Sequence, residues 1–182
     1  MKKNLLLIIV IFLLISGCLE NPEPEEQFYT FEIPQDKLAF YVIEDLSEEV
    51  LYNEIPIDSI KKFGERFISY EEIISYDTVY FSFEILEIAM ERVCSINNKY
   101  GKWCMPFAVV SKGEVIFGAY LYHPQSSCFP YWYYSTAIRQ KKLTIYAPVW
   151  TEKPLKTDPR KDPRMINVLL EDGKIKGSIK EN

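Results

Sequence analysis

Residues 107–120 read Phe107-Ala-Val-Val-Ser-Lys-Gly-Glu-Val-Ile-Phe-Gly-Ala-Tyr120, and this stretch decides the fold class. Two runs of mainly apolar residues, 107–110 and 115–120, flank the tetrapeptide Ser111-Lys-Gly-Glu114. Gly113 can adopt a positive φ, which tight hairpin turns require. The stretch therefore predicts a β-hairpin, the building unit of an antiparallel sheet.

The segment before the hairpin, residues 84–98, predicts the main helix. Its apolar side chains recur at the spacing of one helix face. These side chains are Ile85, Ala89, Val93 and Ile96, and Leu86, Met90 and Cys94 broaden the face. Asn97, Asn98 and Gly101 tolerate left-handed geometry, so they predict the end of the helix. We expect a helix that packs against the core.

The remaining elements are shorter. Strands are predicted at 38–43, at 78–82 after a turn at Asp77, and at 143–147. Asp162 can cap a short C-terminal helix that has Pro163 at its first position and ends at Gly173. Hairpins with a few helices favour the α+β class. We expect a mostly antiparallel sheet with the main helix and the short C-terminal helix packed on one face.

The N-terminus carries a targeting signal. Lys2 and Lys3 precede an apolar run, residues 5–15, that is too short to span a bilayer. The residues Ile15-Ser-Gly-Cys18 resemble the lipobox of lipoproteins. The resemblance implies cleavage after residue 17 and acylation of the Cys18 thiol, although a plain signal peptide or an uncleaved anchor remains an alternative. The predicted organisation is a signal peptide (1–17), a lipidated acidic tether (18–27), one domain (28–173) and a polar tail (174–182).

Charge restricts the partners. The chain has 182 residues, with 21 Lys and Arg against 26 Asp and Glu. Removal of residues 1–17 takes away Lys2 and Lys3, which leaves 19 basic residues and a formal charge of −7. An acidic protein lacks the positive field that a phosphate backbone requires, so we expect no nucleic-acid partner. The acyl anchor at Cys18 is the predicted membrane contact, and it places the domain on the extracytoplasmic side.

Three cysteines follow the lipobox: Cys94, Cys104 and Cys128. An exported compartment permits disulfides. Cys104 and Cys128 lie in irregular stretches on either side of the hairpin, so they are the predicted pair, while three unpaired thiols remain an open alternative. Cys94 is expected to be buried on the main helix as a small hydrophobic residue.

The middle of the chain is similar to a known family. Residues 68–120 contain Ile68-Ser-Tyr-Glu-Glu-Ile-Ile-Ser-Tyr76, an apolar strand, the helix, and Pro106-Phe-Ala-Val-Val-Ser-Lys-Gly-Glu-Val-Ile-Phe-Gly-Ala119. This order resembles the periplasmic head subdomain of the protein-export subunit SecD, and it implies a similar α+β fold without translocase activity. The pattern Asp158-Pro-Arg-Lys-Asp-Pro-Arg164, with Gly173-Lys-Ile-Lys176, resembles an uncharacterised family of exported domains.

Sites of chemistry are weakly indicated. Trp103-Cys-Met-Pro106 resembles the start of a thioredoxin site, but Phe107 stands where the second cysteine belongs. Cys128 could act as a nucleophile with His123 as its base, but the sequence indicates no third residue that would orient the histidine. Adjacent carboxylates such as Glu71 and Glu72 are expected to be solvated. We assign no catalytic residue, no metal ligand and no cofactor.

The aromatic stretch 120–134 is the predicted binding surface, because Tyr and Trp combine contact area with a polar tip. The candidate residues are Tyr120, Tyr122, His123, Phe129, Tyr131, Trp132 and Tyr133. The alternative is that Phe129, Trp132 and Tyr134 fill the core. The leading hypothesis is a non-enzymatic, membrane-anchored domain that contacts another envelope component: a protein, a peptide or a glycan. A thiol-dependent envelope enzyme and a passive structural lipoprotein are the alternatives.

Overall fold

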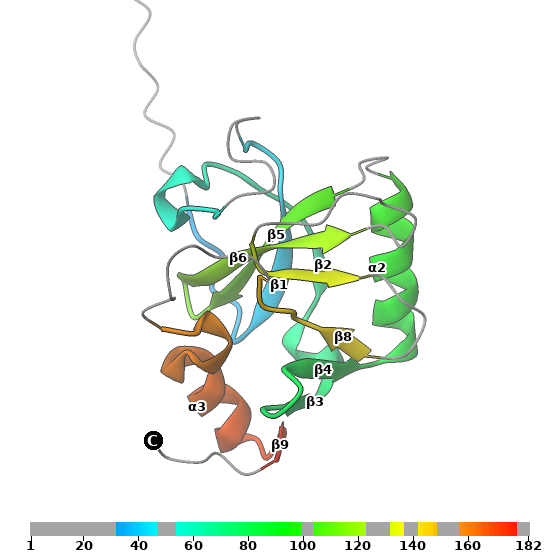
Figure 1. Cartoon of the computed structure of the whole chain (residues 1–182), viewed down its shortest axis with the longest axis vertical. Helices are drawn as coiled ribbons and strands as arrows, with labels where there is room; N and C mark the ends of the chain where they lie inside the picture. Colours follow the sequence, from blue (N-terminus) through cyan, green and yellow to red (C-terminus); the bar gives the residue numbers. More distant parts are fainter. Residues whose placement is uncertain are drawn as a thin grey trace, which may run out of the picture. The chain divides into compact units, whose positions relative to one another are not determined.

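The chain folds into two sheets and two helices. The structure is a computed structural model that describes residues 32–46, 54–99, 104–122, 132–136, 142–148 and 157–177. The first sheet has the order β2-β1-β5-β6-β7, with β1 (Ala39–Ile43), β2 (Phe63–Ile68), β5 (Cys104–Ser111), β6 (Glu114–Tyr122) and β7 (Tyr134–Thr136) (Figure 1). The second has the order β8-β4-β3-β9, with β3 (Ile73–Asp77), β4 (Ser82–Ile85), β8 (Lys142–Thr144) and β9 (Ile175–Lys176). The helices are α2 (Glu87–Lys99) and α3 (Pro163–Glu171), and short 3-10 turns occur at η2 (Ile57–Ser59), η3 (Tyr70–Glu72) and η4 (Pro159–Lys161).

The predicted hairpin is confirmed as β5 and β6, which pair antiparallel through Phe107 opposite Ala119. Lys112 and Gly113 form its turn with φ angles of 49° and 79°. Within the described residues only the β6–β7 and β3–β9 pairings are parallel. The α+β class with mostly antiparallel pairing is therefore confirmed, although the strands divide into two sheets where the sequence suggested one.

One residue pair links the two sheets. Tyr134 of β7 donates its backbone N–H to the carbonyl of Tyr146, and Tyr146 donates back to the carbonyl of Tyr134, at 3.2 and 2.7 Å. Tyr146 follows β8, the edge of the second sheet. The edge strands of both sheets are thus joined at this pair.

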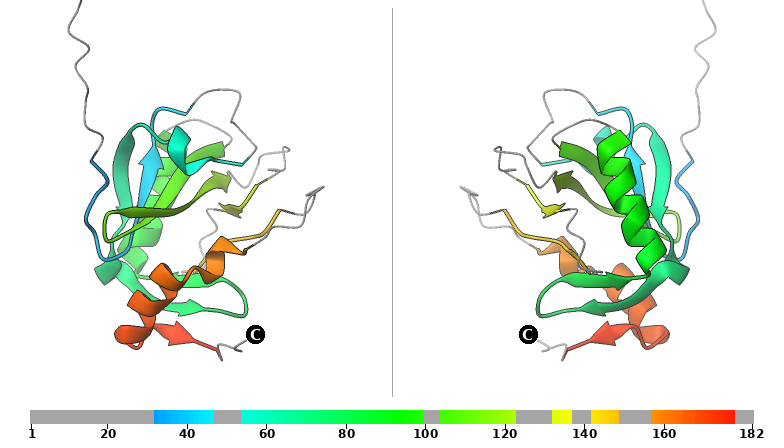
Figure 2. Two further views of the ribbon diagram at one scale, coloured as in Figure 1. Left: turned by 90° about the vertical axis from the view of Figure 1, so that its left-hand side faces the viewer. Right: turned by 90° about the vertical axis from the view of Figure 1, so that its right-hand side faces the viewer.

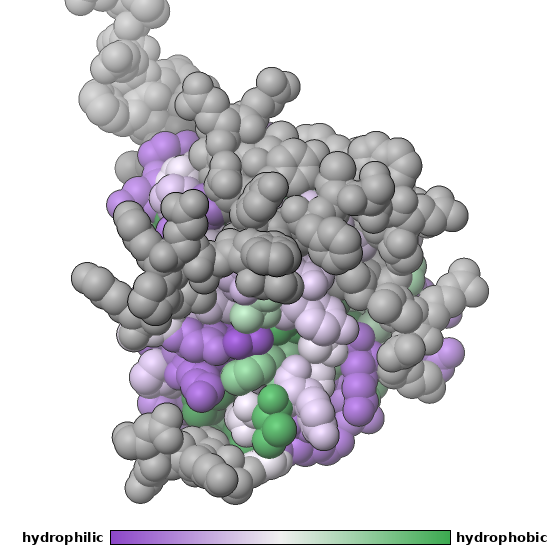
Figure 3. Space-filling model, viewed as in Figure 1, coloured by the Kyte–Doolittle hydropathy of each residue, from purple (hydrophilic) through white to green (hydrophobic). Residues whose placement is uncertain are grey.

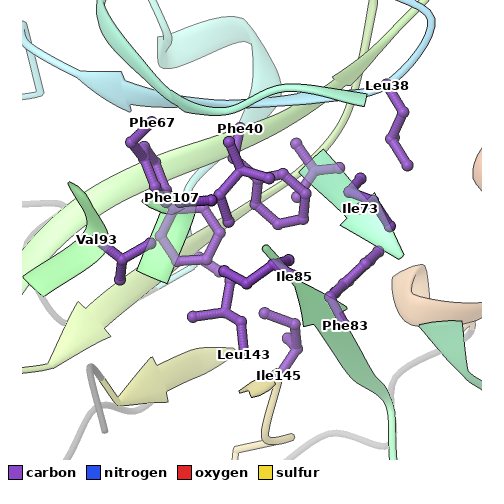
Figure 4. Close-up of a cluster of buried hydrophobic side chains, with 14 of the residues drawn as sticks. Leu38, Phe40, Phe67, Ile73, Phe83, Ile85, Val93, Phe107, Leu143 and Ile145 are labelled. Atoms are coloured by element: carbon purple, nitrogen blue, oxygen red, sulfur yellow. The ribbon is translucent and has the colours of Figure 1, made fainter. Parts of the chain in front are cut away.

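The core lies between the sheets and the helices. Phe40 of β1 contacts Phe83 of β4 edge-to-face with ring centroids 5.0 Å apart, and its ring lies 6.0 Å from those of Phe67 and Phe107 (Figure 4). Both helices contribute to the same cluster of buried side chains, with Ala89, Met90, Val93 and Ile96 from α2 and Met165, Val168 and Leu169 from α3. In Figure 2 these helices lie at separate places around the strands. Of the predicted helix face, Ala89, Met90, Val93 and Ile96 are buried. Two expectations are wrong: Ile85 belongs to β4, with the exposed Leu86 before α2, and Cys94 is half-buried rather than buried.

The predicted strand 78–82 is wrong in its first four residues. Residues 78–81 form a turn, and β4 begins at Ser82. The Asp77 carboxylate accepts hydrogen bonds from the backbone N–H groups of Val79 and Tyr80 at 2.8 and 3.0 Å, which closes an Asx turn. Phe81 then takes a φ of 52°, which is uncommon outside glycine. The alternation of side chains in 79–82 imitates a strand that these hydrogen bonds prevent.

The C-terminal helix begins as predicted. The Asp162 side chain accepts from the backbone N–H of Arg164 at 2.9 Å, Pro163 occupies the first helical position, and Gly173 after the helix has a φ of 66°. No helix within the described ranges is long and apolar enough to cross a membrane.

Residues 174–177 belong to the fold, although the sequence suggested that a polar tail begins at 174. Here β9 pairs parallel with β3, and Lys174 Nζ donates to the carbonyls of Tyr70 and Ile73 at 2.8 and 2.6 Å. The ammonium of Lys174 lies 4.1 Å from the centroid of the Tyr70 ring, and the ammonium of Lys37 lies 4.7 Å from it. Burial lowers the pKa of Lys174. These contacts hold the segment after α3 against β3.

Candidate ligand-binding groove

The structure places most of the describable aromatic candidates inside the protein. Tyr120 and Tyr122 of β6 and Tyr133 before β7 are buried. Trp132 is half-buried, and its indole Nε1 donates to the carbonyl of Gly118 at 3.1 Å. These side chains support the core, so they offer little surface to a ligand.

The other predicted site residues lie mainly outside the described ranges. They are Cys18, His123, Cys128, Phe129 and Tyr131. Cys104 is buried at the start of β5 and stands opposite Tyr122 in the β5–β6 register. Lipidation of Cys18 and the Cys104–Cys128 disulfide therefore remain predictions.

An open groove of about 460 Å³ lies where the two sheets meet. We call it the tyrosine groove and define it by Tyr80, Tyr134, Lys142, Thr144, Tyr146 and Arg160; Ser82, Ile145 and Ala147 also line it. The residues come from the β3–β4 turn, β4, β7, β8 with the residues after it, and η4. Figure 3 shows apolar and weakly polar side chains gathered in the region of β8, β4 and this turn, flanked by hydrophilic ones.

A pair of stacked tyrosines forms one wall of the groove. The rings of Tyr134 and Tyr146 have centroids 5.1 Å apart and an interplanar angle of 26°. Their backbones are the reciprocal pair that joins the sheets, and Tyr122 contacts the Tyr134 ring edge-on at 6.0 Å. Burial raises the pKa of Tyr134. Tyr146 stays 41% exposed, so a fixed aromatic surface faces solvent.

The third tyrosine stands on the turn before β4. Tyr80 is 72% exposed, and its backbone N–H is held by the Asp77 carboxylate. The turn is also attached to β9, because Thr78 donates its N–H to the carbonyl of Lys176 at 3.1 Å. Its backbone is therefore fixed while the Tyr80 side chain projects outward.

Arg160 carries a charge that the protein itself neutralises. Its Nε and Nη2 donate to the two carboxylate oxygens of Asp158 at 2.9 and 2.6 Å, and Nη1 donates to the carbonyl of Ile145 at 3.0 Å. The guanidinium also lies 3.8 Å from the centroid of the Phe81 ring. Burial alone would raise the pKa of Asp158, but the hydrogen bonds from Arg160 hold that pKa below its usual value. With only 11% of its side chain exposed, Arg160 supports the groove from within.

Lys142 is the cation that remains available. It is exposed and stands opposite Glu84 in the β8–β4 register. The Glu84 carboxylate bonds Lys176 Nζ at 2.5 Å. Within the described part of the chain, Lys142 makes no ion pair or hydrogen bond through its side chain, and neither do the hydroxyls of Tyr80, Tyr134 and Tyr146. The groove thus offers aromatic faces, three phenol hydroxyls and one ammonium to a ligand.

Sequence reasoning did not single out Tyr80, Lys142 or Tyr146. The signal for two of them was available, because Lys142-Leu-Thr-Ile-Tyr146 alternates between groove and core. Leu143 and Ile145 are 0% and 1% exposed, whereas Lys142 and Tyr146 point to the groove. Tyr80 gave no comparable signal, since its neighbours imitate a strand.

No group of three or more His, Cys, Asp or Glu side chains in the described residues could hold a metal ion. A scan against family models, a search of curated proteins and a search of solved structures each found no match to this chain.

Proposed function

We propose that this protein is a non-enzymatic binding domain, held on the extracytoplasmic side of a membrane by acyl chains on Cys18, that contacts another envelope component through the tyrosine groove. The observation that carries the proposal is the fixed aromatic wall of Tyr134 and Tyr146 facing an open groove with an available ammonium at Lys142.

The groove has the properties of a site that binds without reacting. Its volume falls within the range of about 300–1,000 Å³ that is usual for ligand sites. Tyrosines lose little conformational freedom when they bind, and those already held by stacking and backbone pairing lose less. Arg160 lines the groove, but its guanidinium already forms an ion pair with Asp158 and a hydrogen bond to the carbonyl of Ile145. The lining side chains therefore favour recognition.

The anchor supports this role by its effect on concentration. A single acyl chain binds a membrane marginally, whereas two or more hold a protein there stably. A domain on the tether of residues 18–27 would meet membrane-associated partners at a raised local concentration. Modest affinity in the groove would then be sufficient for function.

The thiol-dependent alternative gains no support from Cys104, which is only 3% exposed. A thiol in apolar surroundings is disfavoured as a thiolate and reacts slowly. A passive structural lipoprotein would need no fixed aromatic groove, so the groove favours the binding role.

Crosslinking in intact cells tests the proposal. A photo-reactive phenylalanine analogue at position 80 should yield a defined crosslinked species. The same analogue at position 79 is the matched control, because Val79 lies on the same turn with 60% exposure and does not line the groove. Equal, diffuse products from both positions would refute the groove as the contact site. Cys18→Ser should move the protein from the membrane to the soluble fraction.

A further inference from the structure

We propose that the tyrosine groove binds an extended, proline-containing peptide that carries an acidic side chain beside Lys142. This inference rests on the proposed function and names the chemistry of its ligand. Three properties of the groove carry it: its hydrogen-bonding character, the shape of its aromatic surface and its charge.

The groove presents polar hydrogens that seek acceptors. The hydroxyls of Tyr80, Tyr134 and Tyr146 and the ammonium of Lys142 make no hydrogen bond within the described residues, and an ammonium only donates. A proline-rich chain has carbonyl acceptors at every residue and lacks the N–H at each proline. Most of its backbone polar groups are therefore acceptors, which the donors of the groove can satisfy. A sugar presents as many hydroxyl donors as acceptors, which this groove matches less well.

The aromatic surface suits a polyproline II segment. Such a segment is extended, has three residues per turn with a rise of about 3.1 Å, and docks its rings against aromatic-lined grooves. The stacked rings of Tyr134 and Tyr146 form one side of the groove, and Tyr80 from the β3–β4 turn lines it as well. Pyrrolidine rings can pack between these phenol faces. A segment that is already extended loses little entropy when it binds.

The local charge selects an acidic side chain. The carboxylate of Glu84, which stands opposite Lys142 in the β4–β8 register, is shared with Lys176, so it balances the charge of the Lys142 ammonium only in part. A glutamate on the peptide would provide a further partner. Because the whole chain has a formal charge of −5, this attraction is confined to the groove, and it should weaken as salt is added.

Calorimetric titration of the domain tests this assignment. The probe is a short peptide with prolines flanking one glutamate. The same peptide with lysine in place of glutamate tests charge, and one with glycine and serine in place of the prolines tests conformation. An oligosaccharide of uronic acids tests the glycan alternative. Lys142→Glu, Tyr146→Ala and Tyr146→Phe probe the groove, and Lys112→Gln on the β5–β6 turn is the control for a lost surface charge.

We expect the proline–glutamate peptide to bind more tightly than either peptide control. Loss of one exposed ion pair lowers affinity about twofold to fivefold. Lys142→Glu also introduces repulsion, so it should weaken binding of the proline–glutamate peptide by more than this. The variant should bind the lysine peptide more tightly than the glutamate peptide. Tyr146→Ala should abolish binding, while Lys112→Gln should not change it. Tyr146→Phe keeps the ring but loses the hydroxyl donor, so it should weaken binding, although less than Tyr146→Ala does.

Three results would overturn the ligand assignment. They are binding of the oligosaccharide in place of the peptide, peptide binding that ignores Lys142 and Tyr146, and no binding of any probe. If position 80 still forms a defined crosslink in cells, the groove keeps its proposed function and only the ligand class is wrong. If that crosslink is also missing, both proposals fail.

Discussion

Arg160→Met should lower the free energy of unfolding by about 3 kcal/mol, because Arg160 makes several buried contacts. The guanidinium is the hydrogen-bond donor to the Ile145 carbonyl and the counter-ion of Asp158. A buried acceptor left without a donor costs about 1–3 kcal/mol. Loss of the cation–π contact with Phe81 adds about 0.5–2 kcal/mol. The Asp158 side chain is 25% exposed, so water recovers part of the lost ion-pair energy.

The chain contains its own control, because the Asp-Pro-Arg pattern occurs twice. Arg164 grips Asp162 with the same local geometry, through Nε and Nη2 at 3.0 and 2.8 Å, but 44% of its side chain is exposed. Arg164 also donates through Nη1 to the exposed carboxylate of Glu114 at 2.6 Å. Exposed pairs contribute about 0.2–1 kcal/mol each, so Arg164→Met, which removes both pairs, should cost about 1 kcal/mol. The two variants should then differ by about 4–8 °C in Tm for a chain of this size.

Urea unfolding followed by circular dichroism measures both variants, with an unchanged slope as the sign that only stability has altered. Equal destabilisation by Arg160→Met and Arg164→Met, within about 0.5 kcal/mol, would refute the view that burial sets the strength of the two clamps. A double variant of Arg160→Met with Asp158→Asn should be less destabilised than the two single effects added together, because the two residues share one contact.

Three further predictions follow from other contacts. Gly118→Ala should lower the free energy of unfolding by about 1–3 kcal/mol in urea titrations, because its Cβ would lie 2.8 Å from the Ile55 side chain; no loss would show that Ile55 moves aside. Hydrogen bonds from Arg164 lower the pKa of Asp162, so the stability it contributes is present above about pH 4 and is lost as the pH falls through the folded-state pKa. Asp162→Asn should therefore show a shallower acid-induced loss of stability than the wild type. Burial and a hydrogen bond to Asp36 raise the pKa of Tyr41 to about 12, so its contribution is complete below the ordinary phenol pKa of about 10 and is lost as the pH rises toward 12. Tyr41→Phe should reduce the loss of stability at alkaline pH. Titration of the phenolate absorbance should show one fewer late-ionising tyrosine in this variant than in the wild type.

The fold could be predicted where local chemistry decides the structure. Gly113 specifies the hairpin turn, and Asp162 with Pro163 specifies a helix start, because each acts on neighbours within a few residues. The strand predicted at 78–82 failed for a related reason. The Asp77 carboxylate accepts the two backbone N–H groups that a strand would donate to its neighbour. The alternation of Val79 and Phe81 with polar neighbours does not reveal these hydrogen bonds.

The candidate site was harder to predict because its residues meet only in three dimensions. Tyr80, Tyr134 and Tyr146 come from segments that approach through the pairing of β7 with the chain after β8. The aromatic composition of 120–134 pointed to the right region, but Tyr120 and Tyr133 serve the core. Composition indicates where aromatic surface is plentiful, whereas burial decides which rings a ligand can reach.

The contacts of Lys174 make folding depend on the order in which the polypeptide is synthesised. Its ammonium binds carbonyls that lie 104 and 101 residues earlier in the chain, at Tyr70 and Ile73. During translation, the edge of β3 that faces away from β4 therefore stays unpaired until β9 has been synthesised. An unpaired strand edge can pair with another chain. A polypeptide that terminates after Gly173 should self-associate on release from the ribosome, even though α3 is complete.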